Sequence, residues 1–135
     1  MSVRPHFARA ACILLVEDNP RLREIECATL RELGYDVSGA GTANEAVKLL
    51  RSPGFALIVT DIRLPDGLSG IDLAWEAKRV SRGTKILLVG GDLDEFSADD
   101  FRETCDASLP KPFTLDQFRA QIAALIGEPT VRSLV

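Results

Sequence analysis

The chain has 135 residues, of which 46% are hydrophobic and 27% charged, a composition that predicts one globular domain and excludes a disordered chain. The net charge of −4 argues against a dedicated nucleic-acid binder, and no apolar run approaches the roughly 18 residues that a membrane span needs. Three scattered cysteines and a single histidine, His6, argue against a disulfide framework, a zinc site and histidine-dependent catalysis, so we expect a reducing, cytoplasmic location.

Strand and helix patterns alternate along the chain. Short, continuous apolar runs predict strands at residues 12–16, 35–40, 55–60, 85–89 and 107–109. Helical spacing and capping residues predict helices that follow these strands, at about residues 20–33, 42–51, 69–81, 97–104 and 114–126. In the first helix Leu22, Ile25, Leu30 and Leu33 recur at helical spacing, and in the third we expect Trp75 to serve packing and not function.

Five strand–helix units in succession predict an α/β fold of the (βα)5 type. Right-handed crossovers would produce a parallel sheet that helices cover on both faces. We assign residues 12–127 to this domain, and residues 1–11 and 128–135 to an N-terminal and a C-terminal tail. Open parallel sheets bind ligands beyond the carboxyl ends of their strands, so the residues that follow each strand are the candidates for a site.

Charged side chains follow three of the predicted strands. Glu17 and Asp18 come after the first strand, Asp61 after the third and Lys111 after the fifth. Clustered carboxylates favour a hard cation such as Mg²⁺, a carboxylate beside the metal can attack phosphorus, and a lysine can pair with a phosphoryl oxygen. Each residue alone has a structural explanation, as an acidic helix start, a turn or a loop. Their combination at one edge of the sheet favours a phosphoryl and metal site.

Three segments carry a resemblance to a known family. Residues 13–20 (ILLVEDNP), 58–70 (IVTDIRLPDGLSG) and 109–113 (LPKPF) resemble the receiver domain of two-component response regulators, and the resemblance covers about residues 12–127. It implies a doubly wound, flavodoxin-like sheet with strand order 2-1-3-4-5. It further implies that Asp61 accepts the phosphoryl group, that Asp18 binds Mg²⁺ directly, and that Glu17 binds it through water. The backbone carbonyl of Arg63 would be another metal ligand, Lys111 would contact the phosphoryl group, and the donor would be a histidine kinase or a histidine phosphotransfer protein.

Two positions depart from the family pattern. Gly90 stands where the fourth strand of a receiver ends in Thr or Ser, and Ser108 replaces the switch aromatic three residues before Lys111. The backbone N–H groups of Gly90 and Gly91 remain as donors to a phosphoryl group. We therefore expect the phosphorylation chemistry to be retained and the conventional switch to be absent or altered. Phosphorylation shifts the equilibrium between two conformations of a domain only through groups that interact with it differently in the two conformations.

The leading hypothesis is a stand-alone receiver, which is not an enzyme beyond its own phosphorylation and dephosphorylation. It would signal by contact with an unidentified downstream protein through its first and last helices, without a nucleic-acid or membrane partner, and a homodimer is left open. The alternative is a pseudo-receiver that acts as an interaction module independently of phosphorylation, which Gly90 and Ser108 favour. A small phosphatase is disfavoured because Arg63 stands where such enzymes carry a second Asp. For the acidic segment 92–106 we favour a solvated helix face over a docking site.

Overall fold

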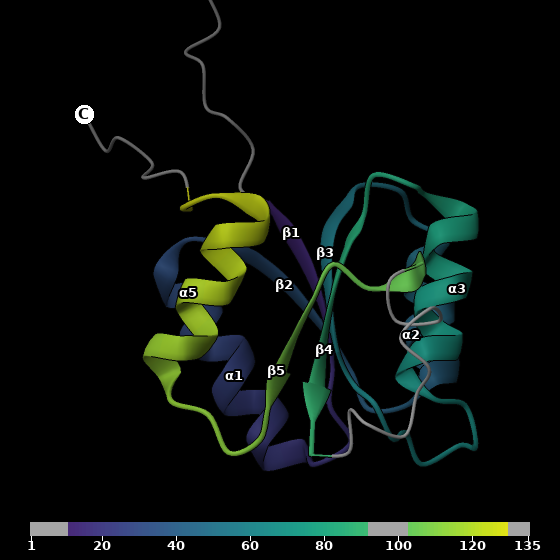
Figure 1. Ribbon diagram of the computed structural model, residues 1–135, viewed down its shortest axis with the longest axis horizontal. Helices are drawn as coiled ribbons and strands as arrows, with labels where there is room; N and C mark the ends of the chain where they lie inside the picture. Colours follow the sequence, from purple (N-terminus) through teal and green to yellow (C-terminus); the bar gives the residue numbers. More distant parts are fainter. Residues whose placement is uncertain (1–10, 92–102, 130–135) are drawn as a thin grey trace, which may run out of the picture.

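A parallel sheet forms the centre of the molecule. The computed structural model describes residues 11–91 and 103–129, and its strands follow the order β2-β1-β3-β4-β5, as predicted (Figure 1). β3 lies in the middle of the sheet and pairs in parallel with β1 and β4, and β5 lies at one edge. The strands are β1 (Cys12–Val16), β2 (Asp36–Ala40), β3 (Phe55–Asp61), β4 (Lys85–Gly90) and β5 (Ala107–Pro110).

Helices cover both faces of this sheet. α1 and α5 lie on one face, and α2 and α3 lie on the other (Figure 1). The bounds are α1 (Pro20–Leu33), α2 (Ala43–Leu50), α3 (Gly70–Val80) and α5 (Leu115–Ile126). Of the acidic helix expected at residues 97–104, only Glu103 and Thr104 belong to the described residues, and both are helical. In the part of the chain that the structure describes, no helix combines the length and the apolar character that crossing a membrane requires.

The helices start at the capping residues that the sequence predicts. Ser69 and Asp72 form a reciprocal capping box at the start of α3, and Thr114 and Gln117 form another at the start of α5. In α1 the Asn19 side chain accepts a hydrogen bond from the Leu22 N–H, and Pro20 occupies the first helical position. Each cap satisfies a backbone donor that the helix itself leaves unpaired and stabilises it by about 1 kcal/mol.

The core consists of two layers, one on each side of the sheet. Alternate residues of β1 point to opposite faces, so that Leu14 packs in the layer beneath α2 and α3, and Leu15 packs in the layer beneath α1 and α5. Ile58 and Leu57 of β3 follow the same alternation. Because both faces of β1, β3 and β4 are buried, these strands have continuous apolar sequences and not alternating ones.

Only some of the apolar residues of α1 and α3 are buried. In α1, Leu30 is buried as its spacing predicts, whereas Leu22 and Ile25 are 36% and 51% exposed and Cys27 faces the sheet instead. The helix packs along a stripe offset from the one that hydrophobicity alone selects, and this orientation also buries Glu26. In α3 the small and aliphatic residues pack against the sheet, whereas Trp75 lies on the outer side and is 45% exposed.

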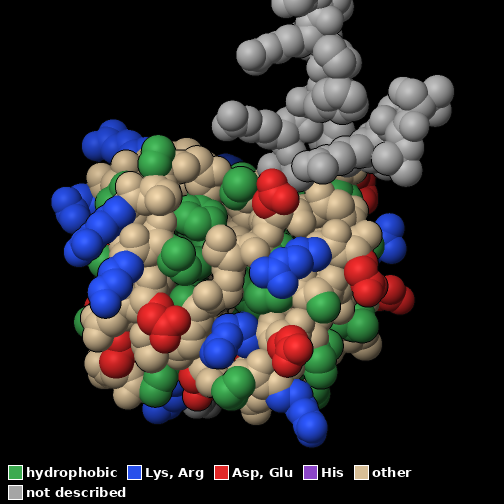
Figure 2. All heavy atoms as spheres, turned by 180° about the vertical axis from the view of Figure 1, so that it is seen from behind, with side chains coloured by type: hydrophobic (Ala, Val, Ile, Leu, Met, Phe, Trp, Pro, Cys, Tyr) green, Lys and Arg blue, Asp and Glu red, His purple; other side chains and the backbone are tan. Residues whose placement is uncertain are grey.

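Charged side chains of both signs lie on the surface seen in Figure 2. On that face, several Lys and Arg side chains gather along the left side, and the Asp and Glu side chains lie mainly below and to the right of them.

Candidate functional site

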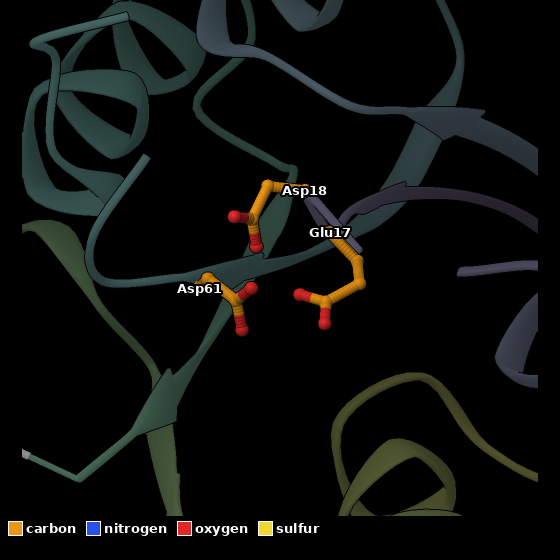
Figure 3. Close-up of side chains that lie close together, drawn as sticks. All are labelled: Glu17, Asp18 and Asp61. Atoms are coloured by element: carbon orange, nitrogen blue, oxygen red, sulfur yellow. The ribbon is translucent and has the colours of Figure 1, made fainter. Parts of the chain in front are cut away.

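The acidic residues after β1 and at the end of β3 lie together at the carboxyl ends of the strands. Val16 pairs with Thr60, so the next residues along the two strands start side by side. One carboxylate oxygen from each of Glu17, Asp18 and Asp61 lies within 4.8 Å of the others, and Figure 3 shows the three side chains pointing toward a common point. Glu17 and Asp61 are 3% and 9% exposed, whereas Asp18 is exposed. The cluster thus has a buried side and an open side.

Lys111 reaches this cluster from the end of β5. Its Nζ lies 2.9 Å from Asp61 Oδ1 and 3.8 Å from Glu17 Oε1. Its backbone N–H donates to the Gly90 carbonyl at 3.2 Å, which fixes the start of the side chain beside β4. The structure therefore brings together all four charged residues that the sequence places at strand ends.

The donor set of the cluster fits a divalent cation. Three carboxylates and one ammonium group leave an excess of negative charge, and oxygen is the ligand type that Mg²⁺ prefers. Glu17 Oε2 is buried without a hydrogen-bond partner among the described residues. A buried, unpaired carboxylate oxygen is costly, and a bound cation with its waters would satisfy it. Glu17, Asp18 and Asp61 are thus suited to hold a metal ion.

Asp61 combines burial with a neighbouring cation. Burial raises the pKa of its carboxyl group, and the hydrogen bond and charge of Lys111 act in the opposite direction. Any further cation in the cluster would favour the ionised form in the same way as Lys111. Since the ionised carboxylate is the nucleophilic form, cations beside Asp61 make it more available for attack on an electrophile.

The loop that follows Asp61 is held at several points. Its first residue, Ile62, donates a backbone hydrogen bond to Val89 and accepts one from Gly70 at 2.6 Å. Arg63 and Ser69 form an antiparallel bridge across the base of the loop. The carboxylate of Asp66 accepts from the backbone N–H groups of Ala43 and Asn44, at 3.1 and 2.9 Å, and so ties the loop to the start of α2. The backbone of Arg63 is thereby fixed beside the cluster.

A cavity of about 280 Å³ opens over the exposed side of the cluster. It is lined by Asp18, Asp61, Ile62, Arg63, Val89, Gly90, Gly91 and Lys111. A Cβ atom added to Gly90 would lie 3.0 Å from Ile62 Cδ1 and 3.3 Å from Ile62 Cγ1. The buried Ile62 side chain therefore packs where a side chain at position 90 would begin. Ser108 lies on β5 opposite Leu88, at a half-buried position.

Three residues near the site have contacts that the sequence-based prediction does not give, although it places Arg23 near the rim of the site. Ile62 packs on Gly90, Glu26 is buried within electrostatic reach of Lys111, and Arg23 donates a hydrogen bond to the carbonyl of Glu17. Burial raises the pKa of Glu26, and the positive charge of Lys111 partly offsets this effect. The sequence carries no signal for these contacts, because each depends on the packing of separate elements and not on a local motif.

Comparison with known proteins agrees with this geometry. A sequence profile described as "Response regulator receiver domain" matches residues 13–123. The transcriptional activator protein PfeR of Pseudomonas aeruginosa is 37% identical over 117 residues, which make up 84% of this chain and 37% of PfeR. The chain thus spans little more than a third of that relative.

Two solved structures have the same fold as the chain. The response regulator protein TrrA of Thermotoga maritima, in complex with Mg²⁺ and BeF, is 30% identical, with a TM-score of 0.75 and coverage of 85% of this chain and 98% of TrrA. A complex of the histidine kinase ThkA with TrrA matches at 29% identity and a TM-score of 0.74, covering 86% of this chain and 98% of that chain. Both similarities extend over nearly the whole of the matched chain.

Proposed function

Since the chain belongs to the family of response regulator receiver domains of two-component systems, we propose that it accepts a phosphoryl group on Asp61. The donor would be a histidine kinase or a histidine phosphotransfer protein. The observation that carries this proposal is the nearly buried Asp61 carboxylate at the edge of the cavity, with Lys111 Nζ at 2.9 Å and two further carboxylates beside it. We assign this role to residues 12–127, with residues 1–11 and 128–135 as tails.

Mg²⁺ is the cofactor that the cluster supports best. Glu17, Asp18 and Asp61 would hold it together with the backbone carbonyl of Arg63, as the fixed loop and the unpaired Glu17 oxygen suggest. When bound, the ion supplies positive charge that neutralises the phosphoryl oxygens. The protein's own contribution is to keep these carboxylates and the Arg63 carbonyl together at the carboxyl ends of the strands, with Glu17 acting through water.

In the proposed reaction an oxygen of the Asp61 carboxylate forms a bond to phosphorus. The bond between phosphorus and the donor breaks at the same time, and the donor atom keeps the electron pair. Lys111 pairs with a phosphoryl oxygen, and the backbone N–H groups of Gly90 and Gly91, which line the cavity, donate to the remaining oxygens. The catalytic contribution is positioning and charge neutralisation, without a protein acid or base.

Gly90 and Ser108 support an altered response to phosphorylation. Gly90 offers no hydroxyl to pull inward, and the buried Ile62 side chain occupies the adjacent space. Ser108 offers no large ring that could rotate. The output would therefore be protein–protein contact with a downstream partner that recognises the charge at Asp61, and not a rotation of an aromatic side chain.

A second candidate function is a pseudo-receiver that binds its partner without phosphorylation. The packing of Ile62 against Gly90 favours it, because this packing fills the space in which a conventional switch side chain would move. The two functions differ in a single observable, namely whether Asp61 becomes modified.

The test is the intact mass of the protein after incubation with acetyl phosphate, with and without MgCl₂. The proposal predicts one added phosphoryl group that requires Mg²⁺ and is absent in Asp61→Asn. A short-lived adduct is detected instead by beryllofluoride binding, which Asp61→Asn should also abolish. Failure of both assays with folded wild-type protein would exclude the phosphoacceptor function and leave the pseudo-receiver.

A further inference from the structure

The side chain of Arg23 crosses from α1 to the end of β2. Its stem passes Gly39, where an added Cβ would lie 3.4 Å from both Cγ and Cδ of Arg23. Its guanidinium group lies beside Gly41, where an added Cβ would lie 2.7 Å from Nη1. Side chains at these two positions would narrow the path of the arginine, so the glycines leave it room.

The guanidinium group ends on the backbone of the acidic pair. Arg23 Nη1 donates to the Glu17 carbonyl oxygen at 2.8 Å in a half-buried position. That carbonyl belongs to the peptide that joins Glu17 to Asp18. On the other side, the Glu17 N–H donates to the Ala40 carbonyl at 3.0 Å. The peptide units before and after Glu17 are therefore both held in place, one by β2 and one by Arg23.

Orientation of the Glu17–Asp18 peptide decides where the two carboxylates point. Glu17 is directed into the buried side of the cluster and Asp18 toward its open side, so a rotation of this peptide would separate their oxygens. From this geometry we propose that Arg23 is a positioning residue for cation binding by Glu17 and Asp18, acting through their shared peptide and not through its charge. This inference rests on the proposed Mg²⁺ site.

The direction in which Mg²⁺ affinity changes when Arg23 is replaced distinguishes a positioning role from an electrostatic one. A positive charge near a cation site repels the cation, so removal of the guanidinium group by a purely electrostatic effect should tighten Mg²⁺ binding. Loss of a positioning hydrogen bond should weaken it, and the loss of residues that orient metal ligands typically costs about 10–100-fold in affinity. We expect Arg23→Met to raise the dissociation constant for MgCl₂ about tenfold or more in isothermal titration calorimetry.

Gly41→Ala offers a second way to break the same contact. The added methyl group would collide with Nη1, which is at the free end of a flexible side chain and can swing away, so the fold should survive. Gly41→Ala should weaken Mg²⁺ binding in wild type and have no further effect in an Arg23→Met background, where the colliding atom is gone. Arg21→Met is the matched control, because it removes an exposed arginine from the same helix and should leave affinity unchanged or slightly higher.

The outcomes are separable from those of the proposed function. If wild type binds MgCl₂ and both Arg23→Met and Gly41→Ala bind it as tightly, Arg23 has no positioning role and the phosphoacceptor proposal stands. Additive losses in the double variant would also overturn the inference, since they would mean that Gly41 acts independently of Arg23. If folded wild type does not bind MgCl₂ at all, the proposed metal site itself is wrong.

Discussion

The close approach of α3 to the end of β3 can be tested by one methyl group. Gly70 is the first residue of α3, and its N–H donates to the Ile62 carbonyl at 2.6 Å. A Cβ atom at Gly70 would collide with the backbone carbonyl oxygen of Asp61 and would lie 3.1 Å from Leu88 Cδ2. The collision is with the backbone, so no side-chain rotation relieves it. Gly70→Ala must therefore move α3 or the peptide of Asp61.

The expected cost follows from two opposing effects. Overpacking in a well-packed region costs about 1–3 kcal/mol, and the rigid backbone contact places this site toward the upper end. Replacing glycine by alanine restricts the unfolded chain and returns roughly 0.4–1 kcal/mol. The net loss is about 2 kcal/mol, which for a domain of this size lowers the melting temperature by roughly 8 °C.

Gly83→Ala provides the matched control. Apart from its two chain neighbours, no described residue has a heavy atom within 4 Å of a Cβ added there, so the same chemical change should be neutral or slightly stabilising. Urea unfolding of the two variants, followed by far-UV circular dichroism, measures the difference in the free energy of unfolding. Mg²⁺ titration of Gly70→Ala should also show weaker binding, because the displaced peptide carries Asp61. If the two variants differ by less than about 0.5 kcal/mol, within the range of neutral surface changes, the reasoning about this contact fails.

Two further substitutions address groups around the site. Burial raises the pKa of Glu26 in the folded state above its value in the unfolded chain. At pH values between these two pKa values the folded state binds more protons than the unfolded state, so the wild type loses stability as the pH rises through this range. Glu26→Gln should therefore have a higher free energy of unfolding than wild type at neutral pH, and this difference should vanish at acidic pH. Urea titrations across this pH range measure the difference, and a difference that does not change with pH would contradict the argument. Gly90→Ala should cost about 1 kcal/mol, because the new methyl group lies 3.0 Å from Ile62 Cδ1, and adding Ile62→Val, which removes that atom, should recover part of the cost. Thermal unfolding of the single and double variants measures this recovery, and an undiminished cost in the double variant would refute the contact.

Strands and helix starts could be predicted from the sequence because local rules determine them, whereas the strand order came from the resemblance to a known family. Continuous apolar runs indicate strands buried on both faces, and a parallel sheet then brings the ends of β1, β3 and β5 to one edge. Asn19, Ser69 and Thr114 mark helix starts through hydrogen bonds that span only three residues. Once β1 and β3 are taken as neighbours, the proximity of Glu17 and Asp61 could be predicted, since the ends of adjacent strands lie side by side.

The orientation of α1 could not be predicted in this way. Hydrophobicity selects Leu22 and Ile25 for the buried stripe, but the helix turns Glu26 and Cys27 toward the sheet. Arg23 explains part of this orientation of α1. Its stem and guanidinium group lie against Gly39 and Gly41, and its Nη1 donates a hydrogen bond to the Glu17 carbonyl. A long side chain that covers backbone with its stem counts as polar in a hydrophobicity pattern, although it packs like an apolar residue.

The groups that perform the proposed chemistry and the groups that fix its geometry are therefore different kinds of residue. Asp61 and Lys111 have reactive atoms, and their place at strand ends is visible in the sequence. Gly41, Gly70 and Ile62 have none, yet each determines how closely another element approaches the cluster. Because the affinity of a metal site depends on ligand orientation as well as ligand identity, substitutions at these positions should alter cation binding while every carboxylate remains in place. A comparison of receiver domains by their charged residues alone would miss such differences.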